Sequence, residues 1–194
     1  MVYSNDSGSE RLIPANFSCA YTEREITERI VELGRDISSW CAGVWRESHT
    51  DVLVLPVLRG GIFFFADLVR QIKASVEIAP VTAVAYRAGK NGIQKDEVEL
   101  TVDSLAVKGR VVLVVDDVCD SGRTLEALET TLTKMGAREV RTAVLVRRLL
   151  DKPSFVPCWV GFQYPGTEWL VGYGMDDSER WRNLPGVYVI KKES

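Results

Sequence analysis

Apolar residues follow two patterns along this chain: a helical spacing of three or four positions in some segments, and unbroken runs in others. Between Ile26 and Val44 they return every three or four positions, a spacing that predicts an amphipathic helix with one buried face. Thr22 and Glu25 stand at the start of this segment in the order of a capping box, so the helix is expected to begin at Thr22 and to continue to about Arg46. A long helix should therefore precede the first central strand.

Runs of consecutive apolar residues follow, and such runs are typical of strands buried on both faces of a sheet. We expect strands at 52–57, 80–87, 98–102, 111–115, 139–146, 159–162, 170–173 and 187–191, and helices at 62–74 and 123–136. The second of these helices should end at a Gly136 cap. Because strands alternate with helices, the pattern predicts an α/β fold with a parallel central sheet.

Length and composition describe an ordinary globular chain. Its 194 residues suit one domain over 1–194, in which the polar, aperiodic residues 1–18 form a loose N-terminal arm. The net charge of -3 and pI near 5.4 argue against nucleic acid as a partner. No apolar run approaches the ~20 residues that span a membrane, so we expect no membrane partner and a cytoplasmic location. Four scattered cysteines and a single histidine disfavour a zinc site or a disulfide framework.

The most informative stretch is VVLVVDDVCDSGRT (111–124), in which a buried strand runs into two carboxylates and then into a turn. In a parallel sheet, ligands bind beyond the carboxyl ends of the strands, where loops lead into helices. Free backbone N–H groups at 120–124, with Gly122 allowing close approach, would cradle an anion such as a monophosphate.

Asp116 and Asp117 would accept hydrogen bonds from vicinal hydroxyls and hold Mg²⁺ through water. Phosphate at one end and a diol at the other describe a ribose 5-phosphate. The plainer interpretation is that DSG (120–122) is an N-cap and that the two aspartates form a solvated turn. It does not explain why two like charges stand side by side at the end of a buried strand. The chain has neither a GxxxxGK[ST] motif nor a GxGxxG motif after a strand.

Three segments resemble one known family. VVLVVDDVCDSGRTL (111–125) is similar to the signature of type I phosphoribosyltransferases, which bind phosphoribosyl pyrophosphate. VLRGGIFFFADLVRQI (57–72) is similar to that family's pyrophosphate loop and the helix after it. VGFQYPGTEWLVGYGMDDSERWRNLPGVYVI (160–190) is similar to the base-binding hood and C-terminal segment of the hypoxanthine-guanine branch. The resemblance implies the type I phosphoribosyltransferase fold, with a small hood formed by about 150–190.

For the donor, the resemblance implies that Asp116 and Asp117 hold the ribose hydroxyls and magnesium. Asp120 would face N7 of a purine as general base. The 5′-phosphate would be held by a loop made of Asp120, Ser121, Gly122, Arg123 and Thr124.

For pyrophosphate, the resemblance implies contacts from Arg182 and from a loop of Arg59, Gly60 and Gly61. It also implies a non-proline cis peptide between Leu58 and Arg59.

For the purine, Trp169 matches the stacking aromatic, and Leu170 matches the residue whose backbone reads the base edge. Asp176 matches a second magnesium ligand. Ala85 and Tyr86 match the pair that opens the family's mobile lid, and the lid continues here from Arg87 to Glu97; the family has a serine where this chain has Ala85.

The family places a lysine where O6 of the base is bound, and here the corresponding residue is Arg148. Arg147 and Lys152 are alternatives if the loop is aligned differently. This departure leaves the preferred purine open.

The resemblance implies an enzyme that transfers ribose 5-phosphate from phosphoribosyl pyrophosphate to N9 of a 6-oxopurine (hypoxanthine or guanine) in purine salvage. It would need Mg²⁺ and release pyrophosphate, and it would form a homo-oligomer, a dimer or tetramer. The alternatives are a transferase for xanthine or another purine, and a regulatory protein that binds phosphoribosyl pyrophosphate.

Overall fold

The computed structural model describes residues 2–3, 12–87, 96–101 and 107–191, with the backbone alone at 2–3, 12, 83–87 and 96–101. The helices of this part are α1 (Glu23–Ser48), α2 (Ile62–Gln71) and α3 (Arg123–Lys134). The strands are β1 (Val2–Tyr3), β2 (Leu12–Ile13), β3 (Phe17–Tyr21), β4 (Val52–Leu58), β5 (Val76–Ile78), β6 (Val81–Arg87), β7 (Asp96–Thr101), β8 (Val111–Cys119), β9 (Glu139–Arg148), β10 (Trp159–Tyr164), β11 (Trp169–Val171) and β12 (Val187–Ile190).

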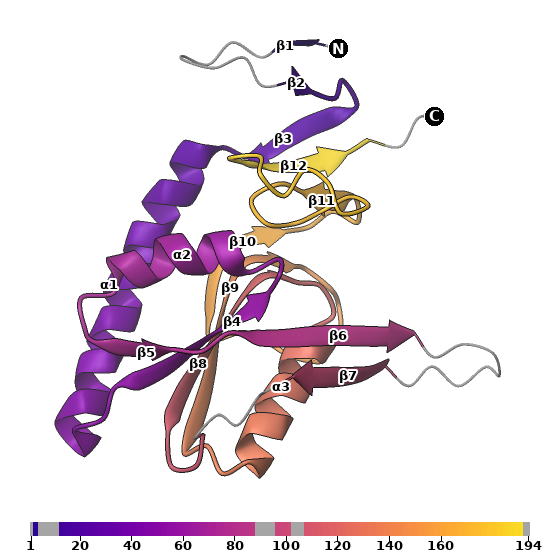
Figure 1. Cartoon of the computed structure of the whole chain (residues 1–194). Helices are drawn as coiled ribbons and strands as arrows, with labels where there is room; N and C mark the ends of the chain where they lie inside the picture. Colours follow the sequence, from indigo (N-terminus) through magenta and orange to yellow (C-terminus); the bar gives the residue numbers. More distant parts are fainter. Residues whose placement is uncertain (1, 4–11, 88–95, 102–106, 192–194) are drawn as a thin grey trace.

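The central sheet has the strand order β10-β9-β8-β4-β6-β7, with β5 also paired to β4. All of these pairs are parallel except β6 with β7. In Figure 1, α1 and α2 lie on one side of this sheet and α3 on the other. The predicted α/β fold with a mostly parallel sheet is therefore confirmed.

The sequence of β8 shows why helices cover both faces of the central sheet. Val111, Leu113 and Val115 pack with residues of α1 and α2, whereas Val112 and Val114 pack with α3. Successive side chains of a strand point to opposite faces, so an unbroken apolar run supplies two cores at once. All five of these residues are fully buried.

The start of α1 confirms the predicted capping box. The backbone N–H of Thr22 donates to Oε2 of Glu25 at 2.8 Å, and the N–H of Glu25 donates to the Thr22 hydroxyl at 3.3 Å. The helix continues to Ser48, two residues beyond the predicted end. Its apolar stripe is buried, apart from a half-buried Trp40.

Several boundaries differ from the prediction. Strand β8 continues to Cys119, so the aspartate pair lies inside the strand and not in the loop after it. The cause is β9, which also extends and pairs Asp116 with Val144 and Cys119 with Arg147. Helix α2 ends at Gln71, three residues early.

A second, three-stranded sheet has the order β11-β12-β3 and is antiparallel. Its strand β3 includes Phe17 and Ser18, which were assigned to the loose arm. Lys191 also donates its N–H to the carbonyl of Asn16 at 2.9 Å. The predicted hood therefore gains a strand from the N-terminal part of the chain (Figure 1).

The predicted lid falls largely outside the described residues. Ala85 and Tyr86 belong to β6, and their backbones pair with Val98 and Glu97 of β7. Their side chains, and residues 88–95, are not described.

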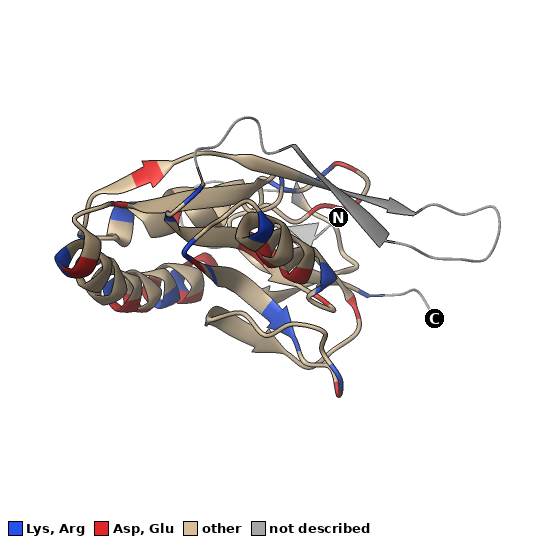
Figure 2. Cartoon of the chain, turned by 90° about the horizontal axis from the view of Figure 1, so that it is seen from below, with Lys and Arg blue, Asp and Glu red and all other residues tan. Residues whose placement is uncertain are grey.

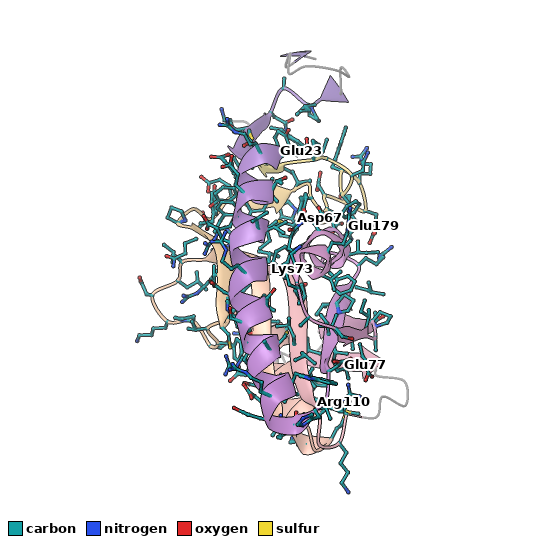
Figure 3. The ribbon with its side chains drawn as sticks, turned by 90° about the vertical axis from the view of Figure 1, so that its left-hand side faces the viewer. Glu23, Asp67, Lys73, Glu77, Arg110 and Glu179 are labelled. Carbon is teal, nitrogen blue, oxygen red and sulfur yellow. The ribbon has the colours of Figure 1, made fainter. Side chains whose placement is uncertain are left out.

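Charges of both signs are interleaved along the ribbon. Figure 2 shows acidic and basic positions alternating along α1. At the end of the molecule away from Glu179, Arg110 and Glu77 form an ion pair of 2.9 Å that links β5 to the residue before β8 (Figure 3). Within the described residues, no helix combines the length and apolar character needed to cross a bilayer.

Candidate active site

A cavity of about 300 Å³ lies beyond the carboxyl ends of β4 and β8. This is where a parallel α/β sheet presents its ligand site. The predicted residues that line it are Gly60, Asp116, Asp117, Asp120, Ser121, Gly122, Arg123, Thr124 and Arg182. The structure thus brings the predicted ribose, phosphate and pyrophosphate groups to a single opening.

The aspartate pair is buried at the bottom of this cavity. Asp116 is 7% exposed and Asp117 8%. The N–H of Asp117 donates to Oδ1 of Asp116 at 2.9 Å, and the N–H of Val118 donates to Oδ1 of Asp117 at 2.8 Å. These bonds fix the orientation of both carboxyl groups.

Burial, and then the adjacent charge of Asp117, raises the pKa of Asp116 well above its usual range. Burial also raises the pKa of Asp117, although hydrogen bonds and the cation of Arg182 oppose the rise. Both carboxylates are therefore held at an energetic cost that a bound cation or donor hydroxyls would relieve.

The 58–61 loop approaches this pair closely. The peptide bond between Leu58 and Arg59 is cis, as predicted. A side chain at Gly60 would collide with the carboxylate of Asp117. Glycine at this position lets the backbone of the loop lie directly against the carboxylate.

The phosphate loop enters α3 through Gly122, whose φ is 89° and ψ is -2°. The first N–H groups of a helix have no partner within the helix, and the helix dipole favours an anion there. On the outer side of the loop, the N–H and the hydroxyl of Ser154 both donate to the carbonyl of Ser121, at 3.0 and 2.8 Å. The loop has the backbone geometry that the predicted anion cradle requires, and Ser154 supports it from a part of the chain that the sequence did not single out.

The C-terminal loop delivers Arg182 to the cavity. Its Nη1 donates to the carbonyl of Gly174 at 2.7 Å, and its Nη2 lies 2.7 Å from Oδ1 of Asp176. Glu179 pairs with Arg59 at 2.7 Å and lies 3.5 Å from Nη2 of Arg182. Both predicted pyrophosphate cations are thus held by carboxylates of one loop.

Glu179 was not predicted as a site residue. The segment DDSER shows a cluster of charges, but nothing in it tells which carboxylate meets Arg59, more than a hundred positions earlier.

Two contacts attach the C-terminal loop to the rest of the fold. A side chain at Gly174 would collide with the carbonyl of Gly60, so the two backbones touch. The hydroxyl of Tyr173 donates to Oδ2 of Asp67 on α2 at 2.5 Å. Figure 3 shows Asp67 and Glu179 at the same end of the molecule. The loop is therefore fixed to both the 58–61 loop and the helix that follows it.

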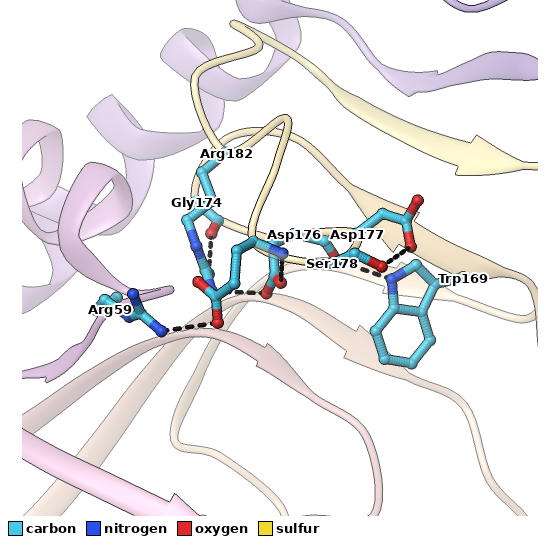
Figure 4. Close-up of polar contacts among 8 residues, drawn as sticks. Arg59, Trp169, Gly174, Asp176, Asp177, Ser178 and Arg182 are labelled. Atoms are coloured by element: carbon cyan, nitrogen blue, oxygen red, sulfur yellow. Dashed lines mark hydrogen bonds and ion pairs between the residues drawn. The ribbon is translucent and has the colours of Figure 1, made fainter.

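Trp169 has an exposed ring. It is 59% exposed, and its Nε1 donates to the carbonyl of Asp176 at 2.7 Å (Figure 4). Leu170 beside it is buried and pairs with Val189 of β12. One fixed edge and an open face suit a stacking residue.

Arg148 lies at the end of β9 with its side chain 12% exposed, and each of the three nitrogens of its guanidinium donates one hydrogen bond. Nε donates to Oδ1 of Asp120 at 2.5 Å, Nη1 to the carbonyl of Gly166 at 2.6 Å, and Nη2 to the carbonyl of Glu168 at 3.2 Å. The guanidinium also lies over the ring of Tyr164, 5.5 Å from its centroid.

Arg147 and Lys152, the two alternatives to Arg148 as the O6 donor, differ in burial. Arg147 has a buried Nε without a hydrogen-bond partner among the described residues, whereas Lys152 is exposed.

The site suits magnesium only with help from a ligand. Within the described residues, no group of three or more His, Cys, Asp or Glu side chains could hold a metal ion. Asp176, expected to converge with Asp116 and Asp117, is instead paired with Arg182. Mg²⁺ is commonly bound by one or two carboxylates together with substrate phosphates and water, and the buried aspartate pair fits that mode.

The comparisons with known proteins define the class. Residues 24–177 match the Phosphoribosyl transferase domain, and the chain belongs to this family. It is 37% identical over 177 residues to the hypoxanthine-guanine phosphoribosyltransferase of Lactococcus lactis, covering 89% of this chain and 90% of that protein. It is 36% identical over 168 residues to the hypoxanthine phosphoribosyltransferase of Escherichia coli, covering 84% and 89%.

A solved structure of a hypoxanthine-guanine phosphoribosyltransferase from Bacillus anthracis matches with a TM-score of 0.74 and 29% identity. The match covers 89% of this chain and 96% of that one. A hypoxanthine phosphoribosyltransferase from Staphylococcus aureus, 23% identical, shares the fold with a TM-score of 0.78 and coverage of 90% and 91%. The predicted type I phosphoribosyltransferase fold is confirmed.

Proposed function

We propose that this protein is a 6-oxopurine phosphoribosyltransferase that acts in purine salvage. It transfers ribose 5-phosphate from phosphoribosyl pyrophosphate to N9 of hypoxanthine or guanine and releases pyrophosphate. The observation that carries this proposal is the single cavity that joins a buried aspartate pair to a helix N-terminus, Gly60 and Arg182. The curated relatives that cover most of the chain are named for the same reaction.

The donor is held at both of its ends. N–H groups of 120–124 bind the 5′-phosphate, while Asp116 and Asp117 accept hydrogen bonds from the ribose hydroxyls. The backbone of 59–61 and the guanidinium of Arg182 bind the pyrophosphate that leaves. Magnesium, when held by Asp116 and Asp117 with Asp176 nearby, would neutralise part of the negative charge on that leaving group.

The base enters on the side of Asp120. The purine ring stacks on the open face of Trp169, while the backbone at Leu170 contacts the edge of the purine. Asp120 accepts or stabilises the proton that the purine loses as N9 bonds to the anomeric carbon. Binding of the departing pyrophosphate by cations and N–H groups supplies electrostatic stabilisation where charge develops.

A competitive panel tests the substrate. The protein is given labelled phosphoribosyl donor with hypoxanthine, guanine, xanthine and adenine at equal concentrations. We expect the 6-oxopurines to be used and adenine to be rejected, because a guanidinium can only donate and would face the donating 6-amino group. Preferential use of xanthine would move the protein to another branch of the family, and turnover of no base would favour a regulatory role.

The chain is proposed to work as one domain, with a hood built around β11 and β12. Ala85 and Tyr86 are proposed to belong to a lid that excludes water during the reaction. A cytoplasmic location and assembly into a dimer or tetramer remain predictions from the sequence.

A further inference from the structure

We infer that Ser154 is a positioning residue for the phosphate loop, and this inference rests on the proposed function. It lies in the connection between β9 and β10, outside the stretch that resembles the phosphoribosyl signature. Its N–H and its hydroxyl both donate to the carbonyl of Ser121, at 3.0 and 2.8 Å. Both acceptor positions of that carbonyl are thereby occupied.

This carbonyl determines which way the next N–H points. The bond between Ser121 and Gly122 is trans, so the C=O of Ser121 and the N–H of Gly122 point in opposite directions. Ser121 and Gly122 line the cavity, whereas Ser154 is absent from its described lining. A carbonyl turned outward to Ser154 therefore turns the N–H of Gly122 inward, toward the phosphate.

Without the hydrogen bonds from Ser154, the peptide between Ser121 and Gly122 would be free to rotate. The φ of 89° and ψ of -2° at Gly122 match the third residue of a type II turn, and the φ of Ser121 is not positive, as it would be in a type I′ turn. The type I turn differs from it mainly by rotation of the central peptide, and glycine adopts both conformations without steric cost. After that rotation a carbonyl oxygen would face the phosphate and repel it.

A second contact holds the same peptide from outside. A Cβ added to Gly122 would lie 2.7 Å from Cβ of Phe155, so residue 155 packs directly against the glycine. Ser154 and Phe155 thus form a support behind the loop. The hydroxyl of Ser154 is the part that substitution can remove without disturbing the packing.

The test is Ser154→Ala, with Ser154→Thr as the variant that keeps the hydroxyl. We expect Ser154→Ala to raise KM for phosphoribosyl pyrophosphate and Kd for ribose 5-phosphate by roughly fivefold, as for the loss of one neutral hydrogen bond, with kcat little changed. Ser154→Thr should stay near wild type. Ser39→Ala is the matched control, because the Ser39 hydroxyl donates to the carbonyl of Arg35 on α1.

Pyrophosphate binding in the presence of Mg²⁺ separates positioning from general damage. Its proposed contacts are at 59–61 and Arg182, so its Kd should not change in Ser154→Ala. Equal affinity of wild type and Ser154→Ala for ribose 5-phosphate would overturn the inference, and so would an equal loss of affinity for both ligands. A wild-type protein that binds ribose 5-phosphate but, when given phosphoribosyl pyrophosphate and Mg²⁺, transfers no ribose 5-phosphate to any purine would instead contradict the proposed function.

Discussion

Nε of Arg148 donates to Oδ1 of Asp120 at 2.5 Å. The cation expected to contact the purine base is therefore bound to the carboxylate expected to receive the proton of that base. The side chain of Arg148 is 12% exposed and that of Asp120 is 56% exposed. The other two nitrogens of the guanidinium bind carbonyls at 166 and 168, just before Trp169. Arg148 therefore connects the 120–124 loop to the segment just before the strand that carries Trp169, the proposed stacking residue.

Replacing Arg148 should affect the base more than the donor. Arg148→Ala is expected to raise KM for hypoxanthine or guanine about tenfold or more, because charge-assisted hydrogen bonds are lost, with KM for phosphoribosyl pyrophosphate nearly unchanged. Steady-state kinetics with each substrate varied in turn measures both values. Arg46→Ala, on the exposed side of α1, is the control. If KM for the base does not change, the O6 donor must be sought at Arg147 or Lys152.

Arg148→Lys is a sharper version of the same experiment. An ammonium keeps the charge but is compact, and it cannot span a carboxylate and two carbonyls as the forked guanidinium does. We expect a KM for the base between those of wild type and Arg148→Ala. Wild-type values would show that charge alone is sufficient at this position.

Asp120→Asn should lower kcat by about 10²–10⁴-fold, the usual range for losing an acid–base group. Asparagine retains an oxygen that can accept the hydrogen bond from Arg148, so the change removes the charge and largely preserves the geometry. Rates at saturating substrates report kcat, and titration with ribose 5-phosphate checks that the phosphate loop is intact. Turnover close to wild type would remove Asp120 from the mechanism.

Asp116→Asn is expected to stabilise the protein at neutral pH while abolishing activity. The pKa of Asp116 is raised on folding, so the folded state binds more protons than the unfolded state between about pH 4 and that raised pKa. The wild-type protein therefore loses stability as pH rises through this window, and the amide variant does not.

Melting temperatures in chelator at several pH values measure this effect. For a chain of this size, each kcal/mol is worth about 2–4 °C in Tm. The variant should melt at the higher temperature at pH 7 to 8, and the difference should disappear near pH 4. A variant that is less stable at pH 7 would mean that the charged carboxylate contributes to the fold.

Removal of divalent metal should abolish the transfer reaction, and Mg²⁺ should restore it. The aspartate pair is buried at the proposed site of the anionic donor, and no described cluster of three ligating side chains could retain the ion without substrate. Activity is measured in excess chelator and then after addition of Mg²⁺. Full activity in chelator would exclude magnesium from the reaction.

Gly174→Ala should weaken donor binding and lower Tm. Its φ is 104°, and a Cβ there would collide with the carbonyl of Gly60, so the C-terminal loop would have to move away from the 58–61 loop. Gly43→Ala in α1 is the matched control, since nothing lies within 4 Å of the added Cβ and alanine favours a helix. Tm and KM for phosphoribosyl pyrophosphate are the measurements. Equal behaviour of the two variants would show that this backbone contact is dispensable.

The sequence predicted the parts of the site that are contiguous along the chain. The apolar run of β8, its aspartate pair and the following turn are read in one stretch, and the aspartate pair and the turn line the same cavity. The end of β8 was placed too early, because pairing with β9 extends the strand through polar residues that a hydrophobic pattern leaves out.

Partners distant in the chain could not be predicted in this way. The hydrogen bonds from Ser154 to Ser121, and the ion pair of Glu179 with Arg59, depend on how loops pack after folding. Strand β3 was also missed, since its residues are only partly buried or exposed and show no strong alternation. Strand β5 has three residues, too few to carry a period.

The pairing of β3 with β12 determines when the protein can become active during synthesis. Residues 17–21 are made before every strand of the main sheet, whereas their hydrogen-bonding partners, residues 187–190, are made after all of them. The main sheet can form while the small sheet still lacks two strands, and closing so long a loop is a slow step. A nascent chain that already has its phosphate loop would therefore still lack the strand that carries Trp169 and the loop that carries Arg182, so it should bind the 5′-phosphate before it can bind the base or the pyrophosphate.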